Sequence, residues 1–328
     1  MAGELITIGI VVAPDDPAPP GLEPLQDEAR VELVRNAADM DRILKDVSVL
    51  AVYDFRTPLL HEADLGRARK LQWIHAASAG VDAVLAPSVV ESDIAVTNSR
   101  GVFDPGIAEY VLGLMLLFAK DFHTTLAYQR EQRWVHRESL LLRGKKLLVV
   151  GAGSIGTEIG RLAKAAGLDV SAIARSQREN PVFGTVHGSD ELHRLLGEAD
   201  FVAVATPLTR ETQGMFDAGA FAAMKAGAWF INIGRGPIVD EAALIDALER
   251  GHVAGAGLDV FIDEPLPEGH PFWKMPNVVV SPHMSGDTVG WERELSALFV
   301  DNVRRWRAGE ELRNTMDKKQ AAGEQPSR

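Results

Sequence analysis

A glycine-rich turn, GAGSIG at residues 151–156, constrains the fold of this chain more than any other feature. Before it, residues 145–150 run from two lysines into an unbroken apolar stretch, as in a strand buried on both faces of a parallel sheet. After it, residues 155–166 carry apolar side chains at helical spacing, Gly167 is placed to end that helix, and residues 168–174 are typical of a further strand. Strand, glycine turn, helix and strand in this order predict a dinucleotide-binding unit, whereas the glycine pattern alone could be an ordinary turn.

Each position of the turn has a physical reason. Gly151 permits the tight turn, Gly153 lets the backbone approach a pyrophosphate, and Gly156 lets the helix pack close to the strand. Ser154 and Ile155 begin the helix, where backbone N–H groups and the positive end of the helix dipole favour phosphate. We therefore expect these five residues to bind a dinucleotide.

Composition limits the classes of partner. The 328 residues suggest two domains, and a formal net charge of −12 disfavours a nucleic-acid partner. The absence of cysteine excludes disulfides, thiolate metal sites and thiol nucleophiles, and no metal is expected. The first residues lack the basic region of a signal peptide, and the longest apolar run, residues 111–119, is too short to span a bilayer. We expect a cytoplasmic protein without a membrane partner.

The first hundred residues alternate between strand and helix patterns. Strands are expected at residues 5–12, 47–53, 71–77 and 94–97, with a helix over residues 29–44. A second set of strands begins after Lys145, at residues 147–150, 169–174, 201–205, 229–233, 255–260 and 278–281. This order predicts an α/β protein built from doubly wound parallel sheets.

Two further segments stand out. Residues 107–128 are expected to form one long, markedly apolar helix, which would be covered either by the core or by a second subunit. Residues 315–328 are polar and without periodicity, so a frayed tail is expected there.

Three predicted strand ends after the glycine turn carry charged or titratable groups. Arg235 stands between two glycines, Asp259 and Glu264 follow the next strand, and His283 follows the last one. Open α/β sheets bind ligands at these ends of their strands. Taken singly, these residues could be a surface arginine, two solvated acids and a loop histidine.

Together they describe a reaction. A carboxylate beside a histidine favours the protonated imidazole, which is then a proton donor near neutral pH. A nicotinamide dinucleotide supplies hydride, and reduction of a ketone needs a matching proton. An arginine can hold the carboxylate of a 2-oxo acid in a bidentate contact. The parts are those of a 2-hydroxy acid dehydrogenase.

The motifs that carry these residues occur in a recognisable order: GAGSIG, PLTRET at 207–212, INIGRGPIVDEAAL, GLDVFIDEPLP and NVVVSPHMSG. The chain resembles the D-isomer-specific 2-hydroxyacid dehydrogenases over nearly its whole length. The resemblance implies that Arg235, Glu264 and His283 are the catalytic set. It further implies that Asp259 contacts the nicotinamide carboxamide and that backbone N–H groups of Ala79 and Gly80 hold the substrate carboxylate.

The resemblance also implies an architecture. A Rossmann cofactor domain, residues 99–287, would be inserted into a flavodoxin-like substrate domain, residues 1–98 and 288–328. Strand-end residues Thr206, Pro207 and Ile233 would complete the cofactor site. Members of the family are usually homodimers through the cofactor domain, which favours an interface role for residues 107–128.

The sequence departs from NAD-specific relatives after the strand at 169–174. An acid that would bind the adenosine ribose is missing there, and Arg175 and Ser176 follow instead. An arginine and a hydroxyl can bind a 2′-phosphate, which an acid would repel; the alternative is an ordinary surface arginine. The pattern is most similar to the NADPH-linked glyoxylate and hydroxypyruvate reductases of the family, so NADP(H) is the expected cofactor, with NAD(H) as the alternative.

Other functions use the same residues. A non-enzymatic NAD(P)-binding regulator of the co-repressor type keeps the catalytic trio, and so could a phosphite dehydrogenase; formate dehydrogenases of this fold have glutamine at the position of Glu264. If the protein is a 2-hydroxyacid dehydrogenase, residues 53–56 are expected to face C3 of the substrate. Large side chains there would favour small acids such as glyoxylate and hydroxypyruvate.

Overall fold

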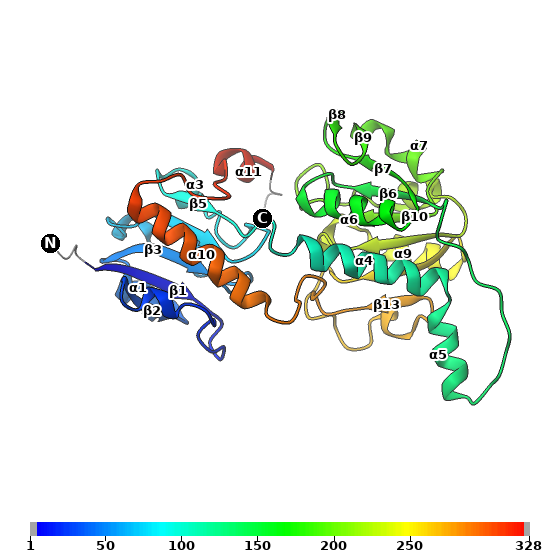
Figure 1. Cartoon of the computed structure of the whole chain (residues 1–328), viewed down its shortest axis with the longest axis horizontal. Helices are drawn as coiled ribbons and strands as arrows, with labels where there is room; N and C mark the ends of the chain where they lie inside the picture. The colour runs from blue at the N-terminus through cyan, green and yellow to red at the C-terminus, as the bar shows by residue number, and fades with distance from the viewer. Residues whose placement is uncertain (1–4, 325–328) are drawn as a thin grey trace. The chain divides into compact units, whose positions relative to one another are not determined.

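The computed structural model describes residues 5–324, and side chains through residue 322. The chain divides into two compact units, between Phe103 and Asp104 and again between Thr288 and Val289 (Figure 1). The first unit is discontinuous, because its last part returns after the second unit is complete. The sequence predicts boundaries after residues 98 and 287, and those of the structure lie slightly further along the chain at both points.

The first unit contains a parallel sheet in the order β2-β1-β3-β4-β5. This is the flavodoxin-like order, in which the chain reverses direction across the sheet at β1 and β3. Its strands are β1 (Ile6–Val11), β2 (Ala29–Val34), β3 (Val47–Val52), β4 (Trp73–Ala76) and β5 (Ala95–Thr97). The predicted fold class is confirmed for this unit.

Helices cover both faces of this sheet. One face packs against α10 (Trp291–Ala308), whose Phe299, Val300 and Val303 join a core with the strands and with Trp73 (Figure 1). The other face packs against a second apolar cluster, to which α1 and α3 contribute. The helical elements of the unit are η1 (Glu23–Leu25), α1 (Ala37–Ile43), α2 (Leu59–Glu62), η2 (Leu65–Arg67), α3 (Pro87–Val90), α10 and α11 (Lys318–Glu324).

The predicted helix over residues 29–44 is wrong in its first half. Residues 29–34 form β2, which pairs in parallel with β1, and α1 begins only after Asn36. The side chain of Asn36 caps α1 by accepting from the N–H of Asp39 at 3.0 Å. The sequence ARVELV alternates between apolar and polar residues, a strand period that the helical pattern of α1 obscured.

The second unit contains a sheet in the order β13-β12-β11-β10-β6-β7-β9-β8, parallel except for the β8–β9 hairpin. Its strands are β6 (Lys146–Val150), β7 (Asp169–Ile173), β8 (Arg178–Asn180), β9 (Gly184–His187), β10 (Phe201–Val204), β11 (Ala228–Asn232), β12 (Val253–Leu258) and β13 (Val278–Val280). The direction of winding reverses at β6, with β7 on one side and β10 on the other. This is the doubly wound Rossmann arrangement, as predicted.

Helices again cover both faces. Side chains of α7 (Leu192–Leu196), α8 (Ala218–Ala223) and α9 (Glu241–Glu249) form the main core with one face of the strands. On the other face, α4 (Asp104–Ala119) lies beside α6 (Ser154–Ala165), and Phe118 stacks on Trp229 of β11 at 4.4 Å (Figure 1). Short 3-10 turns complete the unit: η3 (Ser189–Glu191), η4 (Gly236–Ile238) and η5 (Pro271–Lys274).

The apolar segment 107–128 is two helices rather than one. Helix α4 ends at Ala119, Asp121 takes a left-handed conformation with φ of 52°, and α5 (Phe122–Arg130) starts again in another direction. The Asp121 carboxylate pairs with Arg137 at 2.9 Å, so a partner distant in sequence stabilises the break. None of the helices described between residues 5 and 324 is both long and apolar enough to cross a bilayer.

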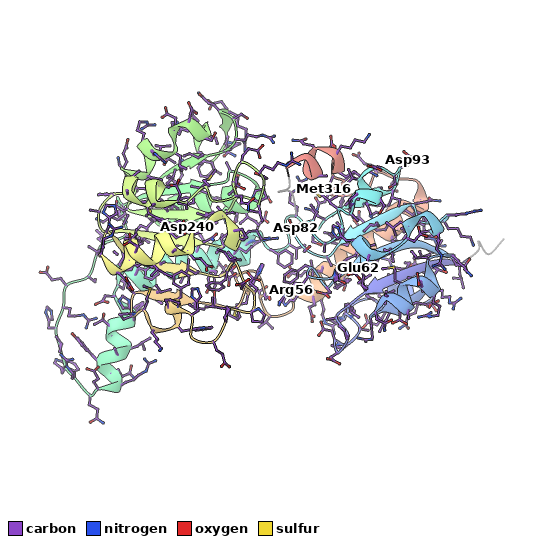
Figure 2. All side chains as sticks on the ribbon, turned by 180° about the vertical axis from the view of Figure 1, so that it is seen from behind. Arg56, Glu62, Asp82, Asp93, Asp240 and Met316 are labelled. Carbon is purple, nitrogen blue, oxygen red and sulfur yellow. The ribbon has the colours of Figure 1, made fainter. Side chains whose placement is uncertain are left out.

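The predicted frayed tail is also partly wrong. The backbone N–H of Met316, labelled in Figure 2, donates to the carbonyl of Val96, and α11 follows. The Lys318 ammonium donates to the carbonyls of Ser92 and Ile94, the latter at 2.7 Å. This anchoring depends on carbonyl groups far away in sequence, which a local pattern does not reveal. Residues 325–328 lie outside the described part of the chain.

Candidate active site

The glycine turn has the geometry that a pyrophosphate site requires. Gly151 has φ of +110°, and a Cβ on it would lie 2.7 Å from the backbone of Ala205. A Cβ on Gly156 would lie 1.8 Å from the Gly151 carbonyl oxygen, so the close approach of helix and strand permits only glycine. Gly153 is exposed, with nothing within 4 Å of its Cβ position. The N-terminus of α6, with Ser154 and Ile155, is therefore accessible to a ligand that lies against Gly153.

The neighbouring strand ends meet this turn. A Cβ on Gly151 would also lie 2.7 Å from the Thr206 nitrogen, and one on Gly234 would lie 2.8 Å from the Thr206 carbonyl oxygen. The N–H of Ile233 donates to Val204 at 3.1 Å, which fixes the two strand ends side by side. Thr206 and the exposed Pro207 thus lie at the switch point between β6 and β10.

Arg175 and Ser176 lie on the surface just beyond β7. The pKa of Glu211 is lowered, first by its own backbone N–H and the Thr209 hydroxyl, and further by the charge of Arg175. A carboxylate therefore lies near Arg175, which the sequence alone did not indicate. It belongs to the PLTRET segment.

Sequence reasoning missed a second arginine at this place. Arg178, on β8, donates from Nη2 to the carbonyl oxygen of Ala152 in the glycine turn at 2.8 Å. The β8–β9 hairpin, which places it there, was not predicted, because each of its strands has only three or four residues.

Arg235 is positioned by a buried amide. The side chain of Asn232, 1% exposed, donates to the Arg235 carbonyl at 3.2 Å and accepts from the Gly234 N–H at 3.0 Å. A Cβ on Gly236 would lie 1.9 Å from the backbone of Phe261. The arginine turn after β11 and the segment leading to Glu264 after β12 are therefore in direct contact.

Glu264 and His283 form a pair. The Nδ1 atom of His283 lies 2.8 Å from Oε2 of Glu264, and both side chains are half-buried. The other oxygen of Glu264 accepts from the N–H of Phe261 at 3.0 Å, which fixes the carboxylate. With Nδ1 turned toward Glu264, the Nε2 atom lies on the side of the ring away from this carboxylate.

Asp259 holds the histidine segment. Its carboxylate, 1% exposed, accepts from the Ser281 hydroxyl at 2.6 Å and from the N–H groups of Met284 and Ser285 at 2.9 Å each. Ser281 in turn accepts from the Tyr110 hydroxyl on α4 at 2.6 Å. The motifs around residues 235, 259, 264 and 283, far apart in sequence, are thus brought together in one unit.

Ala79 and Gly80 lie in the other unit, in the loop that follows β4. The Ser78 hydroxyl donates to the Gly80 carbonyl at 2.7 Å, and the Asn98 amide donates to the Ala79 carbonyl at 2.8 Å. Both contacts use carbonyl oxygens, so they fix the loop while leaving the N–H groups of Ala79 and Gly80 uninvolved in them.

A buried histidine, His75, stabilises the loop that carries Ala79 and Gly80. His75 is fully buried, its Nδ1 lies 2.8 Å from the Thr97 hydroxyl, and its Nε2 lies 3.3 Å from the Ser99 hydroxyl. Burial lowers the pKa of His75 to about 3, so its ring is neutral. The Ser99 N–H donates to the carbonyl of Ser78 at 2.9 Å. His75 therefore has a structural role in the folded protein and is not a candidate proton donor at neutral pH.

The predicted specificity loop, residues 53–56, is only partly exposed. Tyr53 packs into the core of its unit, where its hydroxyl lies 2.9 Å from that of Ser296 and burial raises its pKa to about 12. Phe55 and Arg56 are exposed, with the Arg56 guanidinium 4.9 Å from the centroid of the Phe55 ring. The part of this loop that can contact a ligand is therefore the pair Phe55 and Arg56.

Fold and site define a two-domain protein of the dinucleotide-binding oxidoreductase type. Residues 112–285 match the family described as "D-isomer specific 2-hydroxyacid dehydrogenase, NAD binding domain". The chain belongs to the D-isomer-specific 2-hydroxyacid dehydrogenase family. The resemblance stated from sequence is confirmed.

Individual relatives show the same relationship. The chain is 31% identical to a glyoxylate reductase of Thermofilum pendens over 285 residues, 84% of this chain and 80% of the relative. It is 30% identical, with a TM-score of 0.81, to a D-isomer-specific 2-hydroxyacid dehydrogenase of Xanthobacter autotrophicus Py2 in complex with NADPH and MES, covering 96% and 99% of the two chains. It is 29% identical, with a TM-score of 0.80, to an NADPH-dependent glyoxylate/hydroxypyruvate reductase of Sinorhizobium meliloti in complex with NADP and malonate, covering 98% and 99%.

Proposed function

We propose that this protein reduces a small 2-oxo acid of the glyoxylate or hydroxypyruvate type to the D-2-hydroxy acid. The observation that carries the proposal is the 2.8 Å contact between His283 Nδ1 and Glu264 Oε2, in a unit that also carries the dinucleotide turn. A histidine oriented in this way by a carboxylate can act as a general acid through its other ring nitrogen.

This geometry supports the following proposed roles for the catalytic residues. NAD(P)H, when bound, would supply the hydride that reduces the carbonyl carbon. His283 gives a proton from Nε2 to the carbonyl oxygen, and Glu264 stabilises the imidazolium before that transfer. Arg235 binds the carboxylate and polarises the carbonyl. In the reverse direction, neutral His283 would take the hydroxyl proton, and bound NAD(P)⁺ would be the acceptor of the hydride.

Binding of both ligands is assigned to strand-end loops. The dinucleotide would be held by Gly151, Gly153, Ser154, Ile155 and Gly156, with Thr206, Pro207 and Ile233 beside them at the switch point. Asp259 would offer its remaining acceptor capacity to the nicotinamide carboxamide. The N–H groups of Ala79 and Gly80 would bind the substrate carboxylate together with Arg235.

NADPH is the proposed preferred cofactor. Arg175 and Ser176 follow β7, and Arg178 contacts the glycine turn, so two guanidinium groups lie in the segment proposed to bind a 2′-phosphate. Relatives of known structure that bind NADPH or NADP support this choice. Glu211 acts against it, because its carboxylate lies near Arg175.

The deciding experiment is a panel of 2-oxo acids assayed with NADPH and with NADH. We expect glyoxylate or hydroxypyruvate to have the highest kcat/KM with NADPH. The pair Phe55 and Arg56 would restrict bulk at C3, so phenylpyruvate or 2-oxoisocaproate as the best substrate would contradict the proposed pocket.

Two other functions are distinguished by turnover with oxo acids and by a separate assay with phosphite. A regulator of the co-repressor type would bind NADPH without turnover of any oxo acid. A phosphite dehydrogenase would reduce NADP⁺ with phosphite in the absence of a 2-hydroxy acid. The similarity to a glyoxylate reductase over 84% of this chain favours the oxo-acid reaction.

We also propose a homodimer through the cofactor domain. Beyond α4, helix α5 and the segment up to residue 141 expose large apolar side chains, with Trp134 100% and Leu141 66% exposed. A second copy of the chain would cover them. Analytical ultracentrifugation should give a dimer, and Trp134→Ser with Leu141→Ser should shift it toward monomer. A wild-type chain that sediments as a monomer at all concentrations would contradict this proposal.

A further inference from the structure

The backbone of His283 takes an unusual conformation. Its φ is +55°, in the left-handed region that residues other than glycine seldom occupy. Such a conformation persists only where surrounding contacts hold it. The direction of the imidazole therefore depends on whatever fixes the backbone on both sides of the residue.

The side after His283 is fixed by Asp259. The two oxygens of this carboxylate accept from consecutive backbone N–H groups, Met284 to Oδ1 and Ser285 to Oδ2, each at 2.9 Å. Because Asp259 is 1% exposed, water does not compete for these contacts. The carboxylate thus clamps the two residues that follow the histidine.

The side before His283 is fixed through Ser281. Its hydroxyl donates to Asp259 Oδ1 at 2.6 Å and accepts from the Tyr110 hydroxyl at 2.6 Å. A serine hydroxyl has a single proton, so the bond donated by Tyr110 orients that proton toward Asp259. Burial raises the pKa of Tyr110, which keeps its phenol protonated and able to donate.

We propose that Tyr110 is a positioning residue for His283, acting through Ser281 and the Asp259 clamp. Helix α4 crosses the sheet and brings the phenol to the histidine segment, 171 residues away in sequence. In this chain of contacts the Tyr110 hydroxyl contacts Ser281, and it reaches His283 only through Ser281 and Asp259. The inference rests on the proposed function only where turnover is measured, since the clamp itself can be observed without substrate.

The first test is hydrogen exchange in Tyr110→Phe, which keeps the ring and removes the hydroxyl. The amides of Met284 and Ser285 should exchange roughly fivefold faster, as expected for one weakened hydrogen bond. Tyr53→Phe is the matched control, because it loses a similar tyrosine–serine contact in the other unit. It should leave exchange at Met284 and Ser285 unchanged. Equal exchange in wild type and Tyr110→Phe would overturn the proposal.

The second test is a double-mutant cycle with NADPH and the best oxo acid. Tyr110→Phe should lower kcat about tenfold with little change in KM for NADPH, because the acid is misdirected while the dinucleotide turn is intact. In a His283→Ala background the same change should have no further effect on kcat. An equal loss in both backgrounds would show that Tyr110 does not act through His283.

A third variant tests the same chain of contacts if Tyr110→Phe does not fold. If Tyr110→Phe does not fold, Ser281→Ala breaks the same chain of contacts one step later and should give the same exchange and kcat pattern. If the wild type turns over no oxo acid, the proposed function fails, and hydrogen exchange alone decides whether the clamp exists.

Discussion

The side-chain amide of Asn98 donates a hydrogen bond to the carbonyl oxygen of Ala79 at 2.8 Å. Asn98 is nearly buried, and its own backbone carbonyl is held by the amide of Asn314 at 3.2 Å. The end of β5 thereby fixes the direction of the peptide groups in the loop after β4. An N–H donor placed in this way can act on a carboxylate without rearranging first.

Replacement of Asn98 by Ala should raise KM for every oxo acid while leaving KM for NADPH unchanged. The reason is that the Ala79 peptide would lose its fixed direction, and one hydrogen bond accounts for roughly a fivefold effect. Initial-rate kinetics with each substrate varied in turn measure both constants. An unchanged KM for oxo acids would mean that the Ala79 loop does not bind the carboxylate.

His283→Ala should lower kcat by about 10²–10⁴-fold, the usual range for a positioned acid. Glu264→Gln should lower kcat less than His283→Ala does, because the amide oxygen can still accept from Nδ1 but carries no charge to stabilise the imidazolium. The measurement is kcat as a function of pH for the wild type and both variants. Near wild-type kcat in His283→Ala would remove it from the mechanism.

Arg235→Lys should lower kcat/KM for oxo acids roughly tenfold to a hundredfold despite keeping the positive charge. A lysine cannot make the bidentate contact of a guanidinium with a carboxylate. Asn232 would still brace the turn, so the fold should survive. Thermal unfolding serves as the control, and an unchanged kcat/KM would leave the arginine with a structural role only.

Cofactor choice should respond to two opposite changes near β7. Arg175→Ala should reduce the preference for NADPH over NADH about tenfold, because a charge-assisted hydrogen bond to the 2′-phosphate is lost. Glu211→Gln should increase the preference, because a competing carboxylate is removed. The ratio of kcat/KM for the two cofactors is the readout. If both variants keep the wild-type ratio, the 2′-phosphate is bound elsewhere.

Stability of the first unit should depend on pH through His75. Its pKa is about 3 in the folded protein and about 6.5 when unfolded, so only the unfolded chain takes up the proton as pH falls between these values. The contribution of His75 to the free energy of unfolding is complete above about pH 6.5. Below that pH it falls by about 1.4 kcal/mol per pH unit. Urea unfolding at pH 7, 6 and 5 should show a smaller loss for His75→Gln. Parallel losses in both proteins would exclude His75 as the cause.

The sequence determined the fold class and the identities of the groups that can carry chemistry. The context of GAGSIG was sufficient for the Rossmann unit, because buried parallel strands and a glycine turn are local signals. Arg235, Glu264 and His283 each follow a predicted strand, and parallel strands end at one edge of a sheet, so the sequence indicates these three as candidates. Their roles remain predictions.

Tertiary structure decided everything that depends on partners distant in sequence. Residues 29–34 are a strand because β1 pairs with them, and α4 ends where Asp121 meets Arg137. The contact of Arg178 with the glycine turn, and that of Tyr110 with Ser281, join segments separated by 26 and 171 residues. A pattern within one segment reports its own periodicity and turns, whereas hydrogen bonds and close backbone approaches between segments exist only once the chain has folded.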